Sequence, residues 1–141
     1  MIMDSLKKVT WTNFGVNRDP RGNLIAIEGE QTIPFSIQRI FYMNKVIENR
    51  GGHAHMDTDQ VIIAIHGRFK VSLSDGKEKE VFDFNDPEKG LFVPKMIFTE
   101  LFEFSPDAVC LVLANTHYDI KKSIRTWQEY SNYIAIKNES E

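Results

Sequence analysis

Short stretches in which hydrophobic and polar residues alternate run along most of this chain, and a period of two is typical of β-strands. In residues 36–43, for example, Arg39 and Phe41 fall on one face while Ile40 and Tyr42 fall on the other. Strands are expected over residues 9–14, 24–27, 36–43, 60–66, 69–74, 80–84, 91–93, 97–104 and 108–114. About nine or ten short strands separated by turn residues favour an all-β sandwich or barrel.

Three local patterns sharpen this prediction. Residues 60–66 form a largely apolar run that ends at Gly67, which predicts a strand buried on both faces. Asp75-Gly76 separates two strand-like runs and predicts a tight hairpin, because both residue types tolerate positive φ. Residues 19–23, Asp-Pro-Arg-Gly-Asn, predict a further turn.

Only the C-terminal part has a helical pattern. Ile124, Trp127 and Ile134 fall at near-helical spacing, which predicts a short helix between residues 121 and 133. The polar residues 135–141 are expected to form a frayed tail. We therefore expect one domain over residues 1–141, with its core at about 9–134.

Composition and charge narrow the class of protein. A chain of 141 residues has no room for a cofactor domain and a separate substrate domain. Seventeen basic and twenty acidic side chains argue against nucleic-acid binding. The single cysteine, Cys110, lies in an apolar run and is expected to be a buried, inert thiol. Neither a signal sequence nor a membrane span is evident, so we expect a cytoplasmic protein that binds no membrane.

The segment Arg50-Gly-Gly-His-Ala-His55 carries the candidate chemistry. If it forms a strand, His53 and His55 point to the same face while Ala54 points away. Two histidines that face into a small barrel form either a metal site or an acid–base site. The plainer alternative is a pair of surface histidines on a loop.

The spacing of His53 and His55 with Gln60 and Gly67 resembles the first sequence motif of the cupin superfamily of small β-barrels. The position of that motif's carboxylate is occupied by Gln60, an amide. The resemblance implies a cupin-type small β-barrel, or jelly roll, with a short C-terminal helix.

The second cupin motif is similarly altered. Gly90 and Pro94 match it, but Thr99 stands at the position of its last histidine ligand. Two histidines with an amide and a hydroxyl are a poor ligand set for a metal ion, which needs three or four N, O or S donors. We expect no bound metal; a metal-dependent oxygenase that uses His53 and His55 is the alternative.

The chain also resembles one particular family, the sugar 3,4-ketoisomerases (WxcM-like), over about residues 21–133. The segment 50–55 with Gln60 downstream is similar to the family's RGxHAH…Q signature. Further matches lie at 33–39, 75–76, 90–94, 104–105, 111–114, 118–119 and 124–125. The resemblance implies a cofactor-free, metal-free isomerase that moves the keto group of dTDP-4-keto-6-deoxyglucose from C4 to C3, towards amino sugars of cell-surface glycans. It also implies a homodimer with exchanged N-terminal strands.

This reaction suits the residues present. It needs a proton removed from the carbon beside the ketone, an enediol(ate), and a proton delivered to the neighbouring carbon, which an imidazole can do. His53 matches the family's proposed base, and His55 would return a proton or stabilise the enediolate oxygen. The spacing leaves open which imidazole has which role.

Arginines are the natural donors for the diphosphate of such a substrate. Arg39 and Arg50 match family positions, although Arg39 could instead form an ion pair at the barrel mouth. Tyr42 would stack on the nucleotide base of the substrate or bind its sugar, unless it is a core residue. Arg21 would reach the active site of a neighbouring subunit, or else is a solvated turn residue.

One departure from the family lies at Thr99, a position close to the sugar, where many members have a larger basic or imidazole side chain. A small Thr99 leaves the product configuration at C4, galacto or gluco, undetermined. It also motivates the alternative of a non-catalytic cupin that binds a sugar nucleotide. Arg125, His66 and His117 are expected to be non-catalytic.

Overall fold

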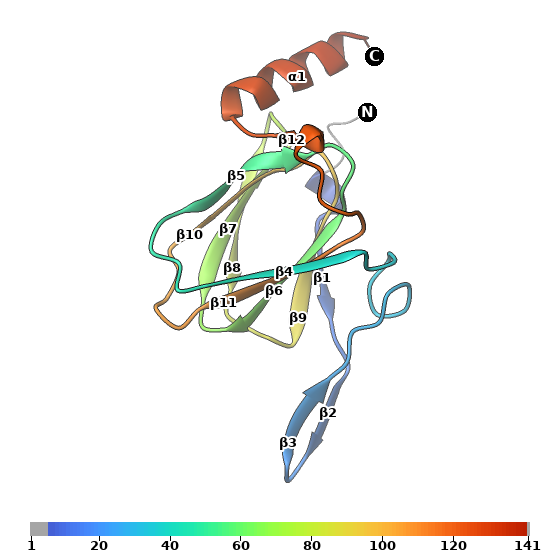
Figure 1. The fold of residues 1–141 in the computed structure, drawn as a ribbon, viewed down its shortest axis with the longest axis vertical. Helices are drawn as coiled ribbons and strands as arrows, with labels where there is room; N and C mark the ends of the chain where they lie inside the picture. Colours follow the sequence, from blue (N-terminus) through green and yellow to red (C-terminus); the bar gives the residue numbers. More distant parts are fainter. Residues whose placement is uncertain (1–5, 141) are drawn as a thin grey trace.

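The computed structural model describes residues 6–140, which fold mainly into two antiparallel sheets packed face to face (Figure 1). The first sheet has the order β1 (Thr10–Asn13), β9 (Lys89–Val93), β6 (Gln60–His66), β11 (Val109–Ala114), β4 (Arg39–Asn44). The second has the order β12 (Ser123–Ile124), β5 (Arg50–His55), β10 (Phe98–Phe102), β7 (Phe69–Ser74), β8 (Lys79–Phe84). A hairpin of β2 (Val16–Asp19) and β3 (Gly22–Ile25), a 3₁₀-helix η2 (Ile120–Lys122) and a helix α1 (Trp127–Ser140) complete the chain. The predicted all-β, cupin-type jelly roll with a C-terminal helix is confirmed.

The hydrophobic core lies between the two sheets. Phe69 stacks on Phe84 with ring centroids 4.9 Å apart, and on Phe104 at 5.0 Å. Apolar residues of both sheets close the core around them, including Ile62, Val71, Leu73, Leu91, Cys110 and Val112. Their removal from water is the main stabilising term of such a fold. Burial raises the pKa of the Cys110 thiol to about 12, which agrees with the inert thiol expected there.

A second apolar cluster covers the outer face of the first sheet. Ile33 and Phe35, from the segment between β3 and β4, pack there with Val61, Ile63 and Leu113. Strand β6 therefore has neighbours on both faces, which is why its sequence is a continuous apolar run, as predicted.

The β7–β8 hairpin forms at the predicted place but with a longer loop. Residues 75–78 connect the strands, and the Asp75 carboxylate accepts hydrogen bonds from the backbone N–H groups of Lys77 (2.9 Å) and Glu78 (2.8 Å). Gly76 has φ +96°, whereas Asp75 is not in the left-handed region. Aspartate therefore acts through its side chain rather than through positive φ.

The C-terminal prediction is wrong in its boundaries. Ile124 does not belong to the helix: it is buried, and in β12 it pairs with Ala54. The helix α1 begins only at Trp127, where the Thr126 hydroxyl caps it by accepting from the Glu129 N–H at 3.1 Å. It continues to Ser140, through most of the predicted tail. Arg125 precedes the helix instead of lying on it.

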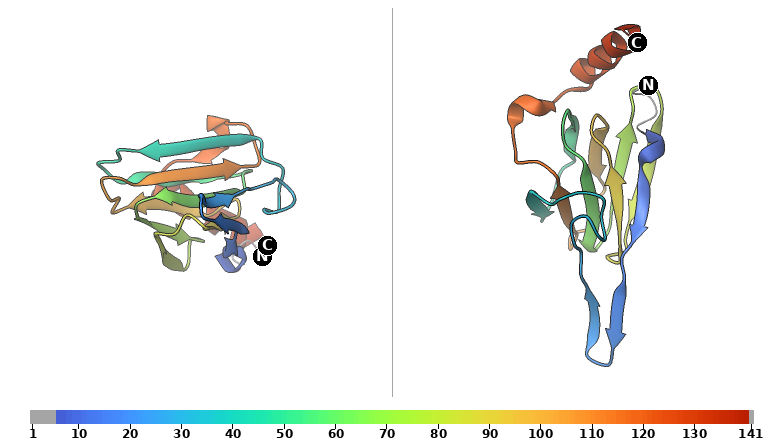
Figure 2. Two further views of the ribbon diagram at one scale, coloured as in Figure 1. Left: turned by 90° about the horizontal axis from the view of Figure 1, so that it is seen from below. Right: turned by 90° about the vertical axis from the view of Figure 1, so that its right-hand side faces the viewer.

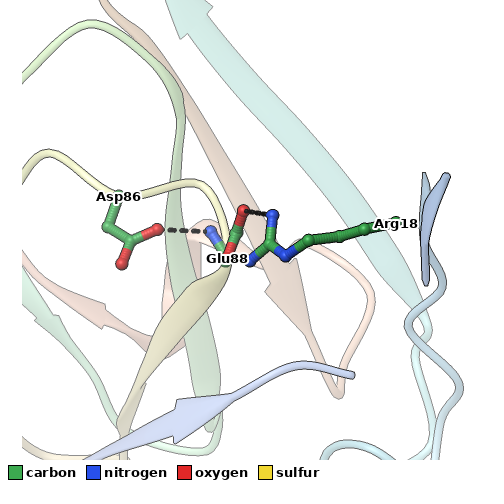
Figure 3. Close-up of polar contacts among 3 residues, drawn as sticks. All are labelled: Arg18, Asp86 and Glu88. Carbon is green, nitrogen blue, oxygen red and sulfur yellow. Dashed lines mark hydrogen bonds and ion pairs between the residues drawn. The ribbon is translucent and has the colours of Figure 1, made fainter. Parts of the chain in front are cut away.

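The β2–β3 hairpin extends away from the two sheets (Figures 1 and 2). Its turn lies within residues 19–23, as predicted, although β3 begins two residues earlier than expected. The Arg18 guanidinium of this hairpin makes a bidentate ion pair with the Glu88 carboxylate (Figure 3). The backbone of Glu88 is fixed in turn, because its carbonyl oxygen accepts from the Phe14 N–H (2.9 Å) and its N–H donates to the Asp86 carboxylate (2.9 Å). No helix within residues 6–140 is both long and apolar enough to cross a membrane.

Candidate active site

The histidine pair lies on strand β5, as the sequence predicts. Both imidazoles point between the sheets, with ring centroids 5.2 Å apart, whereas Ala54 is fully buried on the opposite face. Gly51 allows β5 to approach β10 closely, because a Cβ there would lie 2.7 Å from the Thr99 carbonyl oxygen, and its φ is +87°. The glycines before the histidines are thus part of what places the rings.

The two rings open into a cavity of about 200 Å³ between the sheets. Its lining combines a few polar groups with a largely apolar wall. The lining residues are Phe41, Tyr42, Met43, Arg50, Gly51, His53, His55, Gln60, Ile62, Thr99, Leu101 and Val112. Concave sites of this kind, with few convergent polar groups, are typical of small-molecule binding.

The surroundings of the imidazoles favour their neutral forms. Burial lowers the pKa of His53, and the positive charges of Arg125 and Arg50 lower it further. Burial lowers the pKa of His55 to about 4, with further contributions from His53 and Arg39. Two neutral imidazoles in one cavity can accept a proton at neutral pH.

Arg39 lies at the first position of β4, with its side chain on the inner face. Its guanidinium packs over the rings of Phe41 (5.5 Å) and Tyr118 (5.3 Å), and its Nε is buried without a hydrogen-bond partner. Burial lowers the pKa of this guanidinium. Within the described part of the chain no carboxylate forms an ion pair with Arg39, so the expected alternative of an ion pair at the barrel mouth is wrong.

The other predicted binding residues are only partly brought together. Arg50 and Thr99 line the histidine cavity, and Thr99 is opposite His53 in the β5–β10 ladder. Tyr42 also borders the cavity, but it lies on the outer face of β4 and is 67% exposed, so it is not a core residue. Arg21 is in the turn of the hairpin, paired with Asp19 at 2.7 Å, and does not line this chain's cavity.

The sequence analysis missed Ser123. This residue is opposite His55 in the β12–β5 ladder, so both side chains lie on the inner face. The Ser123 hydroxyl and Arg39 Nε are the two buried side-chain polar atoms without a hydrogen-bond partner in the part of the chain that the structure describes. The helical spacing of residues 124–134 hid the short strand, so no sequence signal pointed to it.

The polar groups of this cavity suit proton transfer better than metal binding. Gln60 and Thr99, which line it beside the histidines, supply only an amide and a hydroxyl. Within residues 6–140, no three His, Cys, Asp or Glu side chains are grouped so that they could hold a metal ion. The fold and the site together define a jelly-roll protein whose cavity is equipped for acid–base chemistry by histidine.

Comparison with known proteins identifies the family. The chain belongs to the family described as FdtA, WxcM-like, C-terminal, whose model matches residues 7–135. It is 39% identical over 128 residues to a TDP-4-oxo-6-deoxy-α-D-glucose-3,4-oxoisomerase of Aneurinibacillus thermoaerophilus, covering 89% of this chain and 92% of that protein. The predicted resemblance is confirmed.

Solved structures agree with this assignment. One is a histidine-to-asparagine mutant of the 3,4-ketoisomerase QdtA from Thermoanaerobacterium thermosaccharolyticum in complex with TDP-4-keto-6-deoxyglucose. It has a TM-score of 0.87 and 34% identity, over 92% of this chain and 95% of that one. Another is the TDP-quinovose 3,4-ketoisomerase WlaRB from Campylobacter jejuni, with a TM-score of 0.85 and 37% identity, over 89% and 98%.

Proposed function

We propose that this protein is a 3,4-ketoisomerase of a dTDP-linked 4-keto-6-deoxyhexose. The observation that carries the proposal is the pair of histidines, both with lowered pKa, in one cavity of a chain that belongs to this family. Relatives that are 34–39% identical bear this activity in their names, and one of them was crystallised with TDP-4-keto-6-deoxyglucose.

The reaction is a balanced proton relocation that needs no external oxidant. A base removes the proton from C3, and the electron pair forms the C3–C4 double bond while the C4 carbonyl oxygen becomes the enediolate oxygen. A proton moves from O3 to O4, C4 receives a proton, and the C3 carbonyl forms. His53 and His55, 5.2 Å apart on one face, are the groups in the cavity suited to remove and return the proton. Their order of action is left open by the geometry.

The substrate's diphosphate would be bound by arginine. Arg50 borders the cavity, and Arg39 offers a guanidinium that forms no ion pair with a carboxylate among the described residues. A guanidinium matches phosphate oxygens with two parallel hydrogen bonds. A bound phosphate would also give the buried Arg39 Nε its missing partner.

The test is isotope exchange in deuterated water. The purified protein is mixed with dTDP-4-keto-6-deoxyglucose, and the sugar is followed by NMR. We expect deuterium uptake at C3 and C4 together with a 3-keto product; a parallel reaction in ordinary water leaves a proton on C4, and its coupling to H5 gives the configuration there. The absence of both deuterium exchange and 3-keto product would refute the proposal of an isomerase. If the protein then still bound the nucleotide, the non-catalytic sugar-nucleotide-binding cupin would be favoured.

Two variants assign the base. His53→Asn is expected to abolish exchange while nucleotide binding stays nearly intact, and persistent exchange would mean that His53 is not the base. His55→Asn is compared in the same assay. His66→Asn is the matched control, because His66 is exposed and pairs with Asp107 at 3.3 Å, outside the cavity.

We also propose a homodimer with exchanged N-terminal strands. The β2–β3 hairpin pairs with no other strand of this chain within residues 6–140, and Leu24 on it is 60% exposed. Ile40 (58%) and Tyr42 (67%) are exposed on the outer face of the first sheet. A partner hairpin would cover such groups and would carry Arg21 towards the partner's cavity.

Light scattering coupled to size exclusion tests the assembly. The protein is expected to elute as a dimer, and Leu24→Asp to shift it towards the monomer by placing a charge in the interface. A wild-type monomer at all concentrations would contradict the dimer. Arg21→Ala is expected to raise KM only if the hairpin reaches the partner's site.

The cellular setting follows from the proposed substrate. A nucleotide-activated keto sugar points to deoxyamino-sugar synthesis for cell-surface glycans and to a cytoplasmic location. Deletion of the gene, followed by analysis of surface glycans and by cell fractionation, tests both.

A further inference from the structure

A second cavity lies on the other face of the second sheet, beside the start of α1. Its volume is about 470 Å³, and its lining includes Ser72, Ser74, Lys79, Phe98, Glu100 and Trp127. Strand alternation separates it from the histidine cavity, because Gly52 borders it while the adjacent His53 points between the sheets. The proposed isomerase reaction uses none of these residues.

Ser72 gives this cavity an unused hydrogen-bonding group. The residue is only 4% exposed, and no hydrogen bond of its hydroxyl is found within the described residues. Its neighbour on the same face, Ser74, is different, because the Ser74 hydroxyl accepts from the Gly76 N–H at 3.0 Å. This oxygen is not among the fully buried atoms that lack a partner, so it is open to the cavity, where a ligand hydroxyl can replace water as its hydrogen-bond partner.

Two opposite charges flank the serines without meeting. In the ladders, Lys79 is opposite Ser74 and Glu100 is opposite Ser72, so the charges lie on the two strands on either side of β7. Strand spacing and a two-residue offset place their Cα atoms about 12 Å apart. Neither forms an ion pair among the described residues.

Trp127 supplies a flat apolar wall. Its ring is held by Phe98 (centroids 5.2 Å apart) and by Tyr130 (5.7 Å), yet the residue remains 47% exposed beside the cavity. An indole fixed in this way offers one face to a ligand at little entropic cost.

We propose that this cavity binds a neutral saccharide. An anion would be repelled by Glu100, a cation by Lys79, and an apolar ligand would leave Ser72 unpaired. Sugar hydroxyls both donate and accept, so one ring can bond to an ammonium, a hydroxyl and a carboxylate while its C–H face packs on the indole.

The two tryptophans of the chain provide a direct test. The full-length ¹⁵N-labelled protein is titrated with maltose, methyl α-D-glucopyranoside and methyl α-L-rhamnopyranoside, and the indole N–H resonances are followed and assigned with Trp127→Phe. We expect a saturable shift of the Trp127 resonance with at least one probe. The Trp11 resonance should not move, because Trp11 packs on Phe82 and Phe84 elsewhere.

Variants within the cavity separate binding from general perturbation. Ser72→Ala is expected to weaken saccharide affinity about three- to tenfold, as loss of one hydrogen bond does. The matched control is Val81→Ala, since Val81 is opposite Ser72 on the same face, is half exposed, and does not line the cavity. Isomerase turnover should be unchanged in both variants.

Three results would overturn the proposal. One is the absence of a Trp127 shift with all three saccharides. Another is loss of the shift on addition of saturating TDP, which would place the sugar in the histidine cavity. The third is a stronger response to glycine or L-leucine than to any saccharide, which would make this a site for zwitterions.

Discussion

His53 and His55 are held in surroundings that oppose their protonation. Their rings face a largely apolar cavity, and Arg39, Arg50 and Arg125 add positive charge around them. Both effects destabilise the imidazolium, so each ring stays in the form that can accept a proton. For the same reason, an imidazole that has accepted a proton is a good donor and transfers it readily to an enediolate carbon. A reversible isomerisation requires both steps.

The pH dependence of kcat/KM is expected to reflect these lowered pKa values. Because the base must be neutral, activity should persist as the pH falls below 6.5, the ordinary value for histidine, and decline only near the pKa of the essential imidazole. If His55 is that base, the decline is expected near pH 4, since its pKa is about 4. Initial rates across the acid range test this, and a decline centred at or above pH 6.5 would contradict it.

The cavity is also expected to become a metal site by two substitutions. Gln60 and Thr99 line it together with both histidines, so Gln60→Glu and Thr99→His would complete a set of three imidazoles and one carboxylate. We expect the double variant to bind close to one Zn²⁺ or Ni²⁺ per chain, measured by elemental analysis after dialysis. The single variant Gln60→Glu is the control and should retain much less metal; equal retention by both would show that the four positions do not converge.

At the scale of the strands, Gly90 has a packing role. A Cβ at this position of β9 would lie 2.7 Å from Val61 Cγ1 and 2.8 Å from Phe14 Cζ, between the first sheet and the cluster on its outer face. Gly90→Ala is expected to lower the free energy of unfolding by about 1–3 kcal/mol through overpacking. Gly15→Ala is the matched control, because a Cβ there meets nothing within 4 Å. Urea denaturation of both variants gives the comparison, and equal stabilities would rule out the packing role.

The strands were largely predictable because their signals are local. The apolar run of β6 and the turn residues around positions 20 and 75 act within a few residues, and the structure has these elements where they were expected. The C-terminal boundaries were not predictable, because pairing of Ile124 with Ala54 joins segments that are distant in sequence. A spacing that fits a helix cannot reveal a two-residue strand formed by tertiary contact.

The candidate site likewise has features that the sequence predicts and features that it does not. The common orientation of His53 and His55 follows from strand geometry alone, and the sequence therefore predicted it. The unpartnered hydroxyl of Ser123 and the packing of Arg39 on Tyr118 depend on which strands are neighbours. The effect of Arg125 on both imidazoles likewise depends on the path of the chain after β12.

At the scale of the whole molecule, the second sheet separates two different environments. Its inner face presents the histidines to the cavity between the sheets, and its outer face carries α1 and the second cavity. Tyr130 joins the helix to this sheet, because its single hydroxyl proton is shared between the carbonyl oxygens of Met96 (2.6 Å) and Ser74 (3.1 Å). Strand β5, which carries the two candidate catalytic histidines, is thus supported from behind by α1.

Because the native fold opposes protonation of the cavity histidines, its stability should decrease in mild acid. The unfolded chain binds a proton at each histidine near pH 6.5, whereas folded His55 does so only near pH 4, so the unfolded state holds more protons in this window. The free energy of unfolding is therefore expected to be highest above pH 6.5 and to fall progressively as the pH drops towards 4. Urea denaturation at pH 7 and pH 5 measures the change.

The variant His55→Asn isolates the contribution of this residue. An asparagine does not titrate, so the loss of stability between pH 7 and pH 5 should be smaller in His55→Asn than in the wild type, whatever its absolute stability. His117→Asn is the matched control, since His117 is exposed and lies outside the cavity. Between pH 7 and pH 5 this variant should lose as much free energy of unfolding as the wild type. An equal loss in His55→Asn and in the wild type would mean that the fold does not hold this imidazole neutral, and the acid–base interpretation of the cavity would then lose its electrostatic basis.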